Sequence, residues 1–154
     1  YLPVNAGVRR LRVNAAGTAT TVIDASPTLA ANTDYTVIAA GLLANIAPIV
    51  LTDDNRAPTA GNVKIRVVHG AASAPAVDVY VTAPGAALTG ATPVLTNVPF
   101  RAASGYLTVP AGSYRVRVTL AGTQTVAIDT GDAGVPVVAG RVYTAIARDN
   151  VGGG

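Results

Sequence analysis

The sequence predicts an all-β protein in which antiparallel strands stack as two-layered sandwiches. Apolar and polar side chains alternate along several short stretches, which is the period-two pattern of a half-buried strand. Turn-forming residues recur about every 8 to 12 residues between these stretches, and helical periodicity is scarce. About seven strands with such turns are typical of an immunoglobulin-like sandwich, and an internal repeat predicts tandem copies, the first one incomplete.

The repeat begins at the first residue. Sliding the chain on itself by 105 residues aligns "YLPVNAGVRRLRV" with "YLTVPAGSYRVRV" at Tyr106, and 14 of 24 positions are identical as far as Asp24 and Asp129. After a three-residue insertion in the second copy, "DYTVIAA" aligns with "VYTAIAR", so Tyr35 matches Tyr143. A period slightly above 100 residues indicates tandem domains rather than a solenoid.

Three stretches of the second copy show the clearest strand alternation: "VKIRVVH", "AVDVYV" and "YRVRVTL". Alternate side chains of a strand point to opposite faces, so we expect one buried and one exposed set. The expected buried residues are Val63, Ile65, Val67, His69, Val77, Val79, Val81, Val116, Val118 and Leu120. The expected exposed residues are Lys64, Arg66, Asp78, Tyr80, Arg115 and Arg117. In the first copy, "LLANIA" is short and favours a turn or a single helical turn.

These patterns divide the chain into three parts. Residues 1–50 form the back half of a first sandwich, and residues 63–154 form a second, nearly complete one. Between them, "LTDDNRAPTAGN" at 51–62 breaks the strand pattern with acids, Pro and Gly, as a linker does.

Composition excludes several classes of function. Cys is absent, which excludes a disulfide framework, a thiol nucleophile and a Cys-based metal site. Eleven basic and eight acidic residues give a charge of +3, but the only adjacent basic pair is Arg9 and Arg10, so we expect no nucleic-acid partner. No uncharged apolar run free of Gly and Pro reaches 18 residues, so we expect no membrane insertion. The sequence indicates no cofactor.

His69 is the only histidine, which leaves little scope for catalysis or metal binding. Spacing alone allows a Ser-His-Asp arrangement of Ser73 or Ser104 with His69 and Asp78, but no G-x-S-x-G motif accompanies it. A hydrogen-bonded structural histidine is the simpler interpretation. The acids favour solvated turn positions over a calcium site, and Asp24 and Asp129 favour turn capping. We therefore expect no catalytic and no metal site.

Some exposed side chains are candidates for a ligand surface. Arg10 and Arg12 match Arg115 and Arg117 and would form a row facing an anionic polymer such as an acidic polysaccharide. Tyr80, with other half-buried tyrosines, would offer an aromatic platform for carbohydrate. We retain Tyr80, Arg115 and Arg117 as candidate ligand residues.

Three stretches of the second copy carry a family resemblance: "VKIRVVHGAASAPAVDVYV", "NVPFRAASGYLTVPAGSYRVRV" and "AGRVYTAIA". In this order they resemble the secreted bacterial and archaeal domain of unknown function 4397. The chain departs from that family's S-P-D motif after the histidine, where it has "GAAS". The resemblance implies a β-sandwich, tandem repetition and a secreted or cell-surface location, and it implies no known catalysis.

The first copy lacks the half that corresponds to residues 63–104, so its apolar face requires a cover. A subunit contact is expected there, at Tyr1, Leu2, Val4, Leu11, Val13, Val37 and Ile38. The first copy also continues into "LLANIAPIVLTDD", a predicted extra strand that the second copy lacks. We therefore expect a non-catalytic extracellular structural or adhesive protein that assembles by strand complementation into a filament or surface layer. Its partners are copies of itself or the remainder of a longer repeat array, of which the chain would be a fragment. The alternatives are a carbohydrate- or ligand-binding module and, third, a hydrolase.

Overall fold

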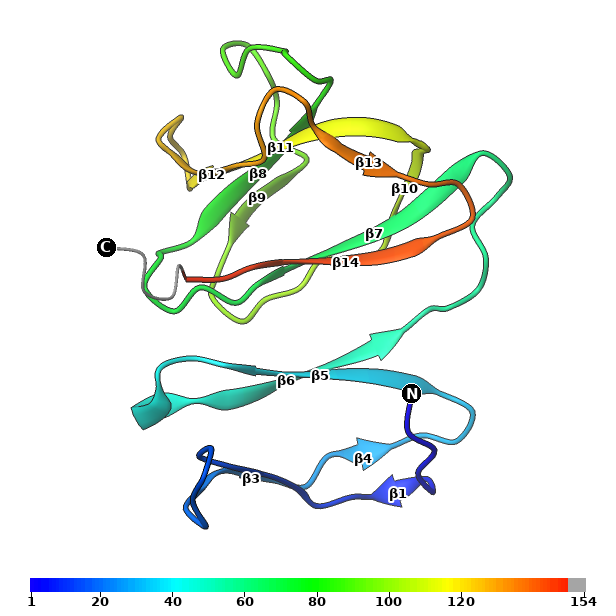
Figure 1. Cartoon of the computed structure of the whole chain (residues 1–154), viewed down its shortest axis with the longest axis vertical. Helices are drawn as coiled ribbons and strands as arrows, with labels where there is room; N and C mark the ends of the chain where they lie inside the picture. The colour runs from blue at the N-terminus through cyan, green and yellow to red at the C-terminus, as the bar shows by residue number, and fades with distance from the viewer. Residues whose placement is uncertain (150–154) are drawn as a thin grey trace. The chain divides into compact units, whose positions relative to one another are not determined.

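The computed structural model describes residues 1–149 and divides the chain into two compact units, Tyr1–Asn55 (unit 1) and Arg56–Gly154 (unit 2). The described residues form strands, turns and one short 3-10 helix, so the predicted all-β class is confirmed (Figure 1). Unit 1 contains β1 (Gly7–Val8), β2 (Leu11–Asn14), β3 (Thr21–Ala25), β4 (Thr28–Leu29), β5 (Asp34–Ala40), η1 (Leu43–Asn45) and β6 (Ala47–Asp53). Unit 2 contains β7 (Asn62–His69), β8 (Val77–Thr82), β9 (Leu95–Val98), β10 (Leu107–Pro110), β11 (Gly112–Leu120), β12 (Val126–Asp129), β13 (Val135–Val137) and β14 (Val142–Ala147).

Unit 2 consists of two sheets. One has the strand order β10-β7-β14, and the other has the order β12-β11-β8-β9 with β13 paired to the first part of β11. Val77, Val79 and Val118 form the buried core on the second sheet, and Val67 of β7 packs against them from the first. One ladder differs from the antiparallel prediction: β14 runs parallel to β7.

Burial in unit 2 extends beyond the predicted faces. Val63, Val77, Val79 and Val118 are buried as predicted. The prediction of exposed side chains at Arg66, Asp78, Tyr80 and Arg117 is wrong, because each is at most 6% exposed. Protein groups replace solvent around the carboxylate of Asp78, which accepts from the N–H groups of Asn97 and Gly122, both within 2.8 Å. Arg66 donates to the Thr144 hydroxyl at 3.0 Å and lies 4.9 Å from the ring centroid of Tyr106.

Unit 1 repeats two strand pairings of the back half of unit 2, although residues 2–5 form no strand to match β10. β1 pairs with β4 through Gly7 and Leu29, as β11 pairs with β13 through Gly112 and Val137. β2 pairs with β3 through Val13 and Ile23, as β11 pairs with β12 through Val118 and Ile128. Both of the latter ladders shift register immediately after the valine. The repeat read from the sequence is therefore a structural repeat down to its β-bulge.

After β5 the two units differ. "LLANIA" forms the single turn η1, and the chain returns as β6, antiparallel to β5 along its whole length. β6 ends at Asp53 and β7 begins at Asn62, so the irregular connection is 54–61, shorter than the expected linker 51–62.

Candidate functional site: the open edge of unit 1

The only histidine is a structural residue of unit 2. His69 is 1% exposed, and its ring lies 6.1 Å from that of Phe100 in an edge-on arrangement. Nε2 lies 3.0 Å from the Pro75 carbonyl, and Nδ1 accepts the N–H of Ala71 at 3.3 Å. Nε2 therefore carries the proton, and both ring nitrogens are used by backbone close in sequence.

The residues weighed for a Ser-His-Asp arrangement do not come together as one. Ser73 donates to Asp149, which also accepts from the N–H of Ala72, and this hydrogen bonding lowers the pKa of the Asp149 carboxyl. Ser104 donates to the Gly105 carbonyl. Asp78 is occupied by two backbone N–H groups. These side chains fix loops of unit 2 and leave no hydroxyl bonded to the histidine ring.

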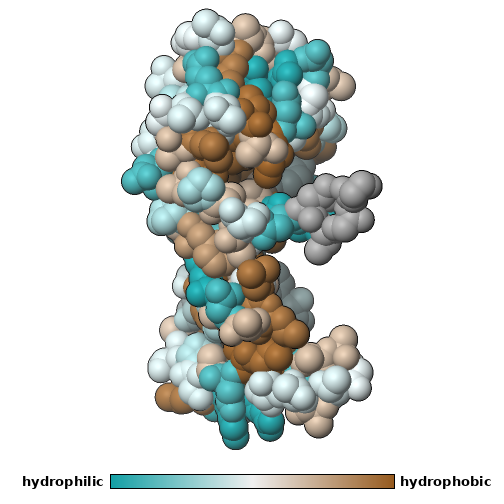
Figure 2. Space-filling view, turned by 90° about the vertical axis from the view of Figure 1, so that its left-hand side faces the viewer, coloured by the Kyte–Doolittle hydropathy of each residue, from teal (hydrophilic) through white to brown (hydrophobic). Residues whose placement is uncertain are grey.

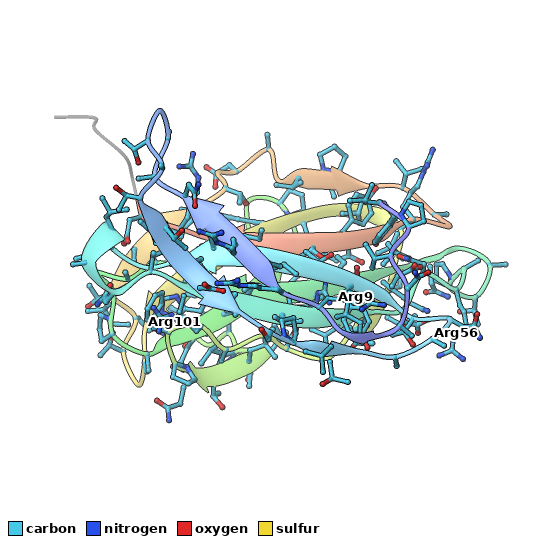
Figure 3. All side chains as sticks on the ribbon, turned by 90° about the horizontal axis from the view of Figure 1, so that it is seen from below. Arg9, Arg56 and Arg101 are labelled. Atoms are coloured by element: carbon cyan, nitrogen blue, oxygen red, sulfur yellow. The ribbon has the colours of Figure 1, made fainter. Side chains whose placement is uncertain are left out.

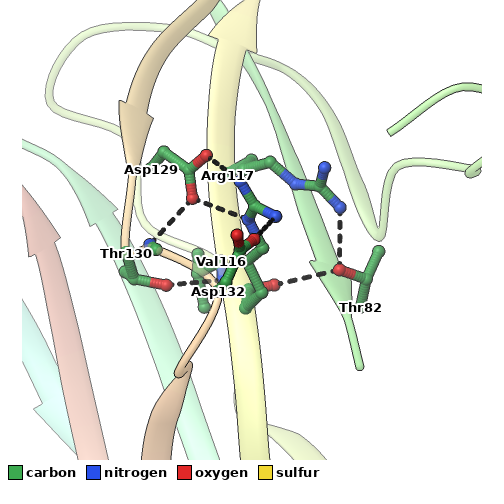
Figure 4. Close-up of polar contacts among 8 residues, drawn as sticks. Thr82, Val116, Arg117, Asp129, Thr130 and Asp132 are labelled. Carbon is green, nitrogen blue, oxygen red and sulfur yellow. Dashed lines mark hydrogen bonds and ion pairs between the residues drawn. The ribbon is translucent and has the colours of Figure 1, made fainter. Parts of the chain in front are cut away.

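Corresponding ion pairs link the same two segments in each unit. Arg115 donates to both carboxylate oxygens of Asp129, at 2.9 and 2.6 Å, and also contacts Asp132 (Figure 4). Arg10 donates to both oxygens of Asp24, at 2.8 and 2.5 Å. The Arg115 hydrogen bonds, aided by the N–H of Gly131, lower the pKa of Asp129 to about 2. The bond to Gly131 fits the predicted turn-capping role of Asp129, whereas the ion pair was not predicted.

The candidate ligand residues do not form an exposed surface. Tyr80 is 6% and Arg117 is 4% exposed, and Arg117 donates to the Thr82 hydroxyl at 2.8 Å. Arg115 is paired with two carboxylates. In unit 2 the arginines expected to face an anionic polymer are thus buried or ion-paired, whereas Arg12 of unit 1 is exposed and donates to the Thr21 hydroxyl at 2.7 Å.

The strand β2 has one paired and one open edge. In unit 2 the main chain of Val116 points toward the end of β12. The Val116 N–H donates to the Thr130 hydroxyl, and the Val116 carbonyl accepts the N–H of Thr130. The alternate residues Arg115 and Arg117 therefore point their main chain toward β8, with which they pair. In unit 1 the corresponding residues are Arg10 and Arg12, and no strand within residues 1–149 pairs with this edge of β2.

Beside this edge unit 1 has an open groove of about 1030 Å³. Tyr1, Leu2, Val4, Leu11 and Val37 line the groove, as expected for the subunit contact, together with Leu29 and Tyr35. Tyr1 and Leu2 are each 83% exposed and Val4 57%. Hydrophobic residues are visible on the surface that unit 1 presents in Figure 2. Two expected contact residues, Val13 and Ile38, do not line the groove; Ile38 points to the opposite face of β5 from its neighbour Val37.

Arg9, labelled in Figure 3, holds the segment with Asn5 and Ala6 that lines the groove. Its guanidinium donates to the carbonyls of Asn5, Ala6 and Val8, at 2.6 to 3.0 Å. Tyr114 occupies the matching position in unit 2 and donates to the carbonyl of Pro110, the counterpart of Asn5, at 2.8 Å. The same turn is thus held by an arginine guanidinium in unit 1 and by a tyrosine hydroxyl in unit 2.

Sequence reasoning missed Leu29 and Tyr35 at the groove. Tyr35 accepts the N–H of Ala30 at 3.0 Å, as Tyr143 accepts that of Val138 at 3.0 Å. The alignment of Tyr35 with Tyr143 was the available signal, since a tyrosine kept in both copies at a strand start indicates a shared structural contact.

The described part of the chain has neither a cluster of metal-binding side chains nor a membrane-spanning helix. No group of three or more His, Cys, Asp or Glu side chains comes together among residues 1–149. The same residues include no helix long and apolar enough to cross a membrane.

Comparison with known proteins identifies a family. No curated protein and no solved structure matches the chain. The family described as "Domain of unknown function (DUF4397)" matches residues 1–80 and 83–153, which together cover nearly the whole sequence. The two matches meet at the end of β8, whereas the compact units meet between Asn55 and Arg56. The chain therefore belongs to the DUF4397 family, of which it carries two tandem copies.

Proposed function

We propose that this chain is a non-catalytic extracellular structural or adhesive protein whose subunits assemble by β-strand complementation into a filament or surface layer. One observation carries the proposal. Unit 1 has the strand pairings of the back half of unit 2, but the edge of β2 that corresponds to the β8-paired edge of β11 has no partner strand among residues 1–149. Unpaired main-chain groups beside exposed apolar side chains favour the addition of a strand.

The size of the exposed apolar surface supports the same proposal. Tyr1, Leu2, Val4 and Val8 of unit 1 are all more than half exposed. Fully burying an aliphatic side chain of this kind contributes about 1.5 to 3 kcal/mol. Covering several of them at once would therefore offset much of the entropic cost of association.

The interior of unit 2 supports the non-catalytic part of the proposal. Its histidine, serines and buried aspartate are engaged in hydrogen bonds that hold loops. The alternative of a carbohydrate-binding module receives no such support, because Tyr80 and Arg117 are buried.

Light scattering and electron microscopy of the purified chain, over a range of concentrations, test the proposal. We expect association that increases with concentration and that Leu2→Asp with Val4→Asp weakens. A matched variant, Val126→Asp with Val138→Asp, changes exposed valines of unit 2 and should leave association intact. A folded protein that stays monomeric at high concentration contradicts the proposal.

A further inference from the structure

The open edge of unit 1 has a defined partner chemistry, because unit 2 shows the same edge with its partner in place. β8 pairs with β11 along six residues, from Arg115 opposite Thr82 to Leu120 opposite Val77. The two valines Val79 and Val118 face each other within this ladder and are at most 6% exposed. β2 has the main-chain directions and the β-bulge of this part of β11.

We propose that the open edge of β2 accepts a strand of the β8 type other than the β8 of residues 1–149 in the same copy, antiparallel and in the register of the β8–β11 ladder. The inference rests on the proposed function and names the strand that it requires. Arg10 then lies opposite the position of Thr82, Arg12 opposite that of Tyr80, and Val13 opposite that of Val79.

The side chains on β2 fit this strand. Val13 corresponds to Val118, and Leu11 to Val116, so inward valines of the incoming strand meet apolar partners. Arg12 corresponds to Arg117, whose guanidinium donates to the Thr82 hydroxyl at 2.8 Å. A threonine two residues after the tyrosine of the incoming strand would give Arg12 the same acceptor.

The donor strand is not the β8 of the same copy. That strand is paired on both edges, with β9 through Val77 and Val98 and with β11 through Val79 and Val118. Residues 63–104 are the front half of the repeat, and residues 1–149 contain only this one front half against two back halves. Exchanging front halves between copies of these residues therefore leaves one back half uncovered per copy. The donor is therefore a front-half strand that is not already paired on both edges in this way.

The test uses the full chain and a synthetic peptide of residues 74–84, "APAVDVYVTAP". Because the chain has no cysteine, Val13→Cys introduces one thiol, and the peptide carries a cysteine in place of Val79 or of Val81. Opposed residues of a non-hydrogen-bonded antiparallel pair have Cα atoms about 4.5 Å apart, whereas a two-residue offset places them beyond disulfide reach. We expect the Val79→Cys peptide to cross-link to Val13→Cys at least about tenfold faster than the Val81→Cys peptide.

Two controls make the result interpretable. Val118→Cys presents the matching position of unit 2, which its own β8 already covers, so no cross-link is expected there. Hydrogen exchange of the unmodified chain avoids any effect of the substitution: at a peptide concentration of 100 times Kd, the amides of Arg10 and Arg12 should exchange about 100-fold more slowly. A Tyr80→Pro peptide lacks one of the N–H groups that point toward β11 and should protect neither amide.

The outcomes separate this inference from the proposed function. Equal cross-linking of both peptides, or unchanged exchange at Arg10 and Arg12, overturns the inference even if the chain assembles. A monomeric chain that binds the peptide in register overturns self-assembly of these residues and keeps the inference. The peptide should also reduce any self-association that uses the β2 edge.

Discussion

Two valines at the same position of the repeat should differ in their contribution to stability. Val118 of β11 is 6% exposed and packs against Val77 and Val79. Its counterpart Val13 of β2 is only half-buried, and no strand within residues 1–149 lies on its second side. Val118→Ala removes two buried methylene equivalents, which is about 1.6 kcal/mol by transfer, and the cavity raises the loss to about 2 to 3 kcal/mol. Val13→Ala removes atoms that are already partly hydrated, so we expect a loss of about 0.5 to 1 kcal/mol.

Urea titration followed by two-dimensional amide NMR measures the two losses separately, because each unit has its own resonances. With a urea m-value of about 2 kcal/mol per molar, Val118→Ala should lower the midpoint of unit 2 by about 1 M. Val13→Ala should lower the midpoint of unit 1 by less than half of that. At a concentration at which the chain is monomeric, equal losses in free energy would refute the reasoning, since they would mean that β2 is covered within the single chain as β11 is.

Three further predictions concern side chains that hold the repeats together. Carbon-13 titration of the Asp129 carboxyl should give a pKa of about 2, below the value of about 3.9 in the unfolded chain. The ionised carboxylate therefore stabilises the fold above about pH 4, and this stabilisation is lost as the pH falls toward 2. Asp129→Asn should flatten the pH dependence of unfolding in that window, and an Asp129 pKa near 3.9 would contradict the ion pair. His69→Ala should destabilise unit 2 by about 2 to 4 kcal/mol in thermal melts, because it leaves the Pro75 carbonyl without its donor and opens a cavity; an unchanged melt would show that the ring is not packed as described. Tyr143→Phe should cost about 1 kcal/mol through the lost acceptor of the Val138 N–H, and Tyr35→Phe should cost unit 1 a similar amount through Ala30; denaturant midpoints that do not move would argue against these bonds.

The strands of the fold could be predicted from the sequence, but the burial of the second face of these strands could not. Alternation identified Val77, Val79 and Val118 as one buried face, because the two faces of a strand are separated by a period of two. The same pattern does not say whether something also covers the other face, which is why Arg117 and Tyr80 were expected in solvent. The alternation of apolar and polar residues also does not indicate the direction of a partner strand, so the parallel pairing of β14 with β7 was not predicted.

For the open edge, the internal repeat was more informative than composition. It located the half without a complement, and five of the seven expected contact residues line the groove. Val37 and Ile38 were both expected at the contact, but adjacent residues of a strand face opposite sides of β5. The Arg10–Asp24 and Arg115–Asp129 pairs were within reach, because both partners recur at matching positions, but their bidentate geometry depends on strand register that spacing alone does not give.

The parallel ladder of unit 2 has a mechanical consequence. Of the strands that the structure describes in the unit, β7 is the first and β14 the last, and they pair from Lys64 opposite Val142 to His69 opposite Ala147. Tension applied at the two ends of the unit pulls these strands along their length in opposite directions, so the hydrogen bonds between them are loaded in shear and must break together. β5 and β6 are antiparallel and joined by a short turn, so a pull on their free ends would open them pair by pair. Under tension, the lifetime of unit 2 is set by its rate of unfolding, and the β7–β14 ladder acts as its clamp.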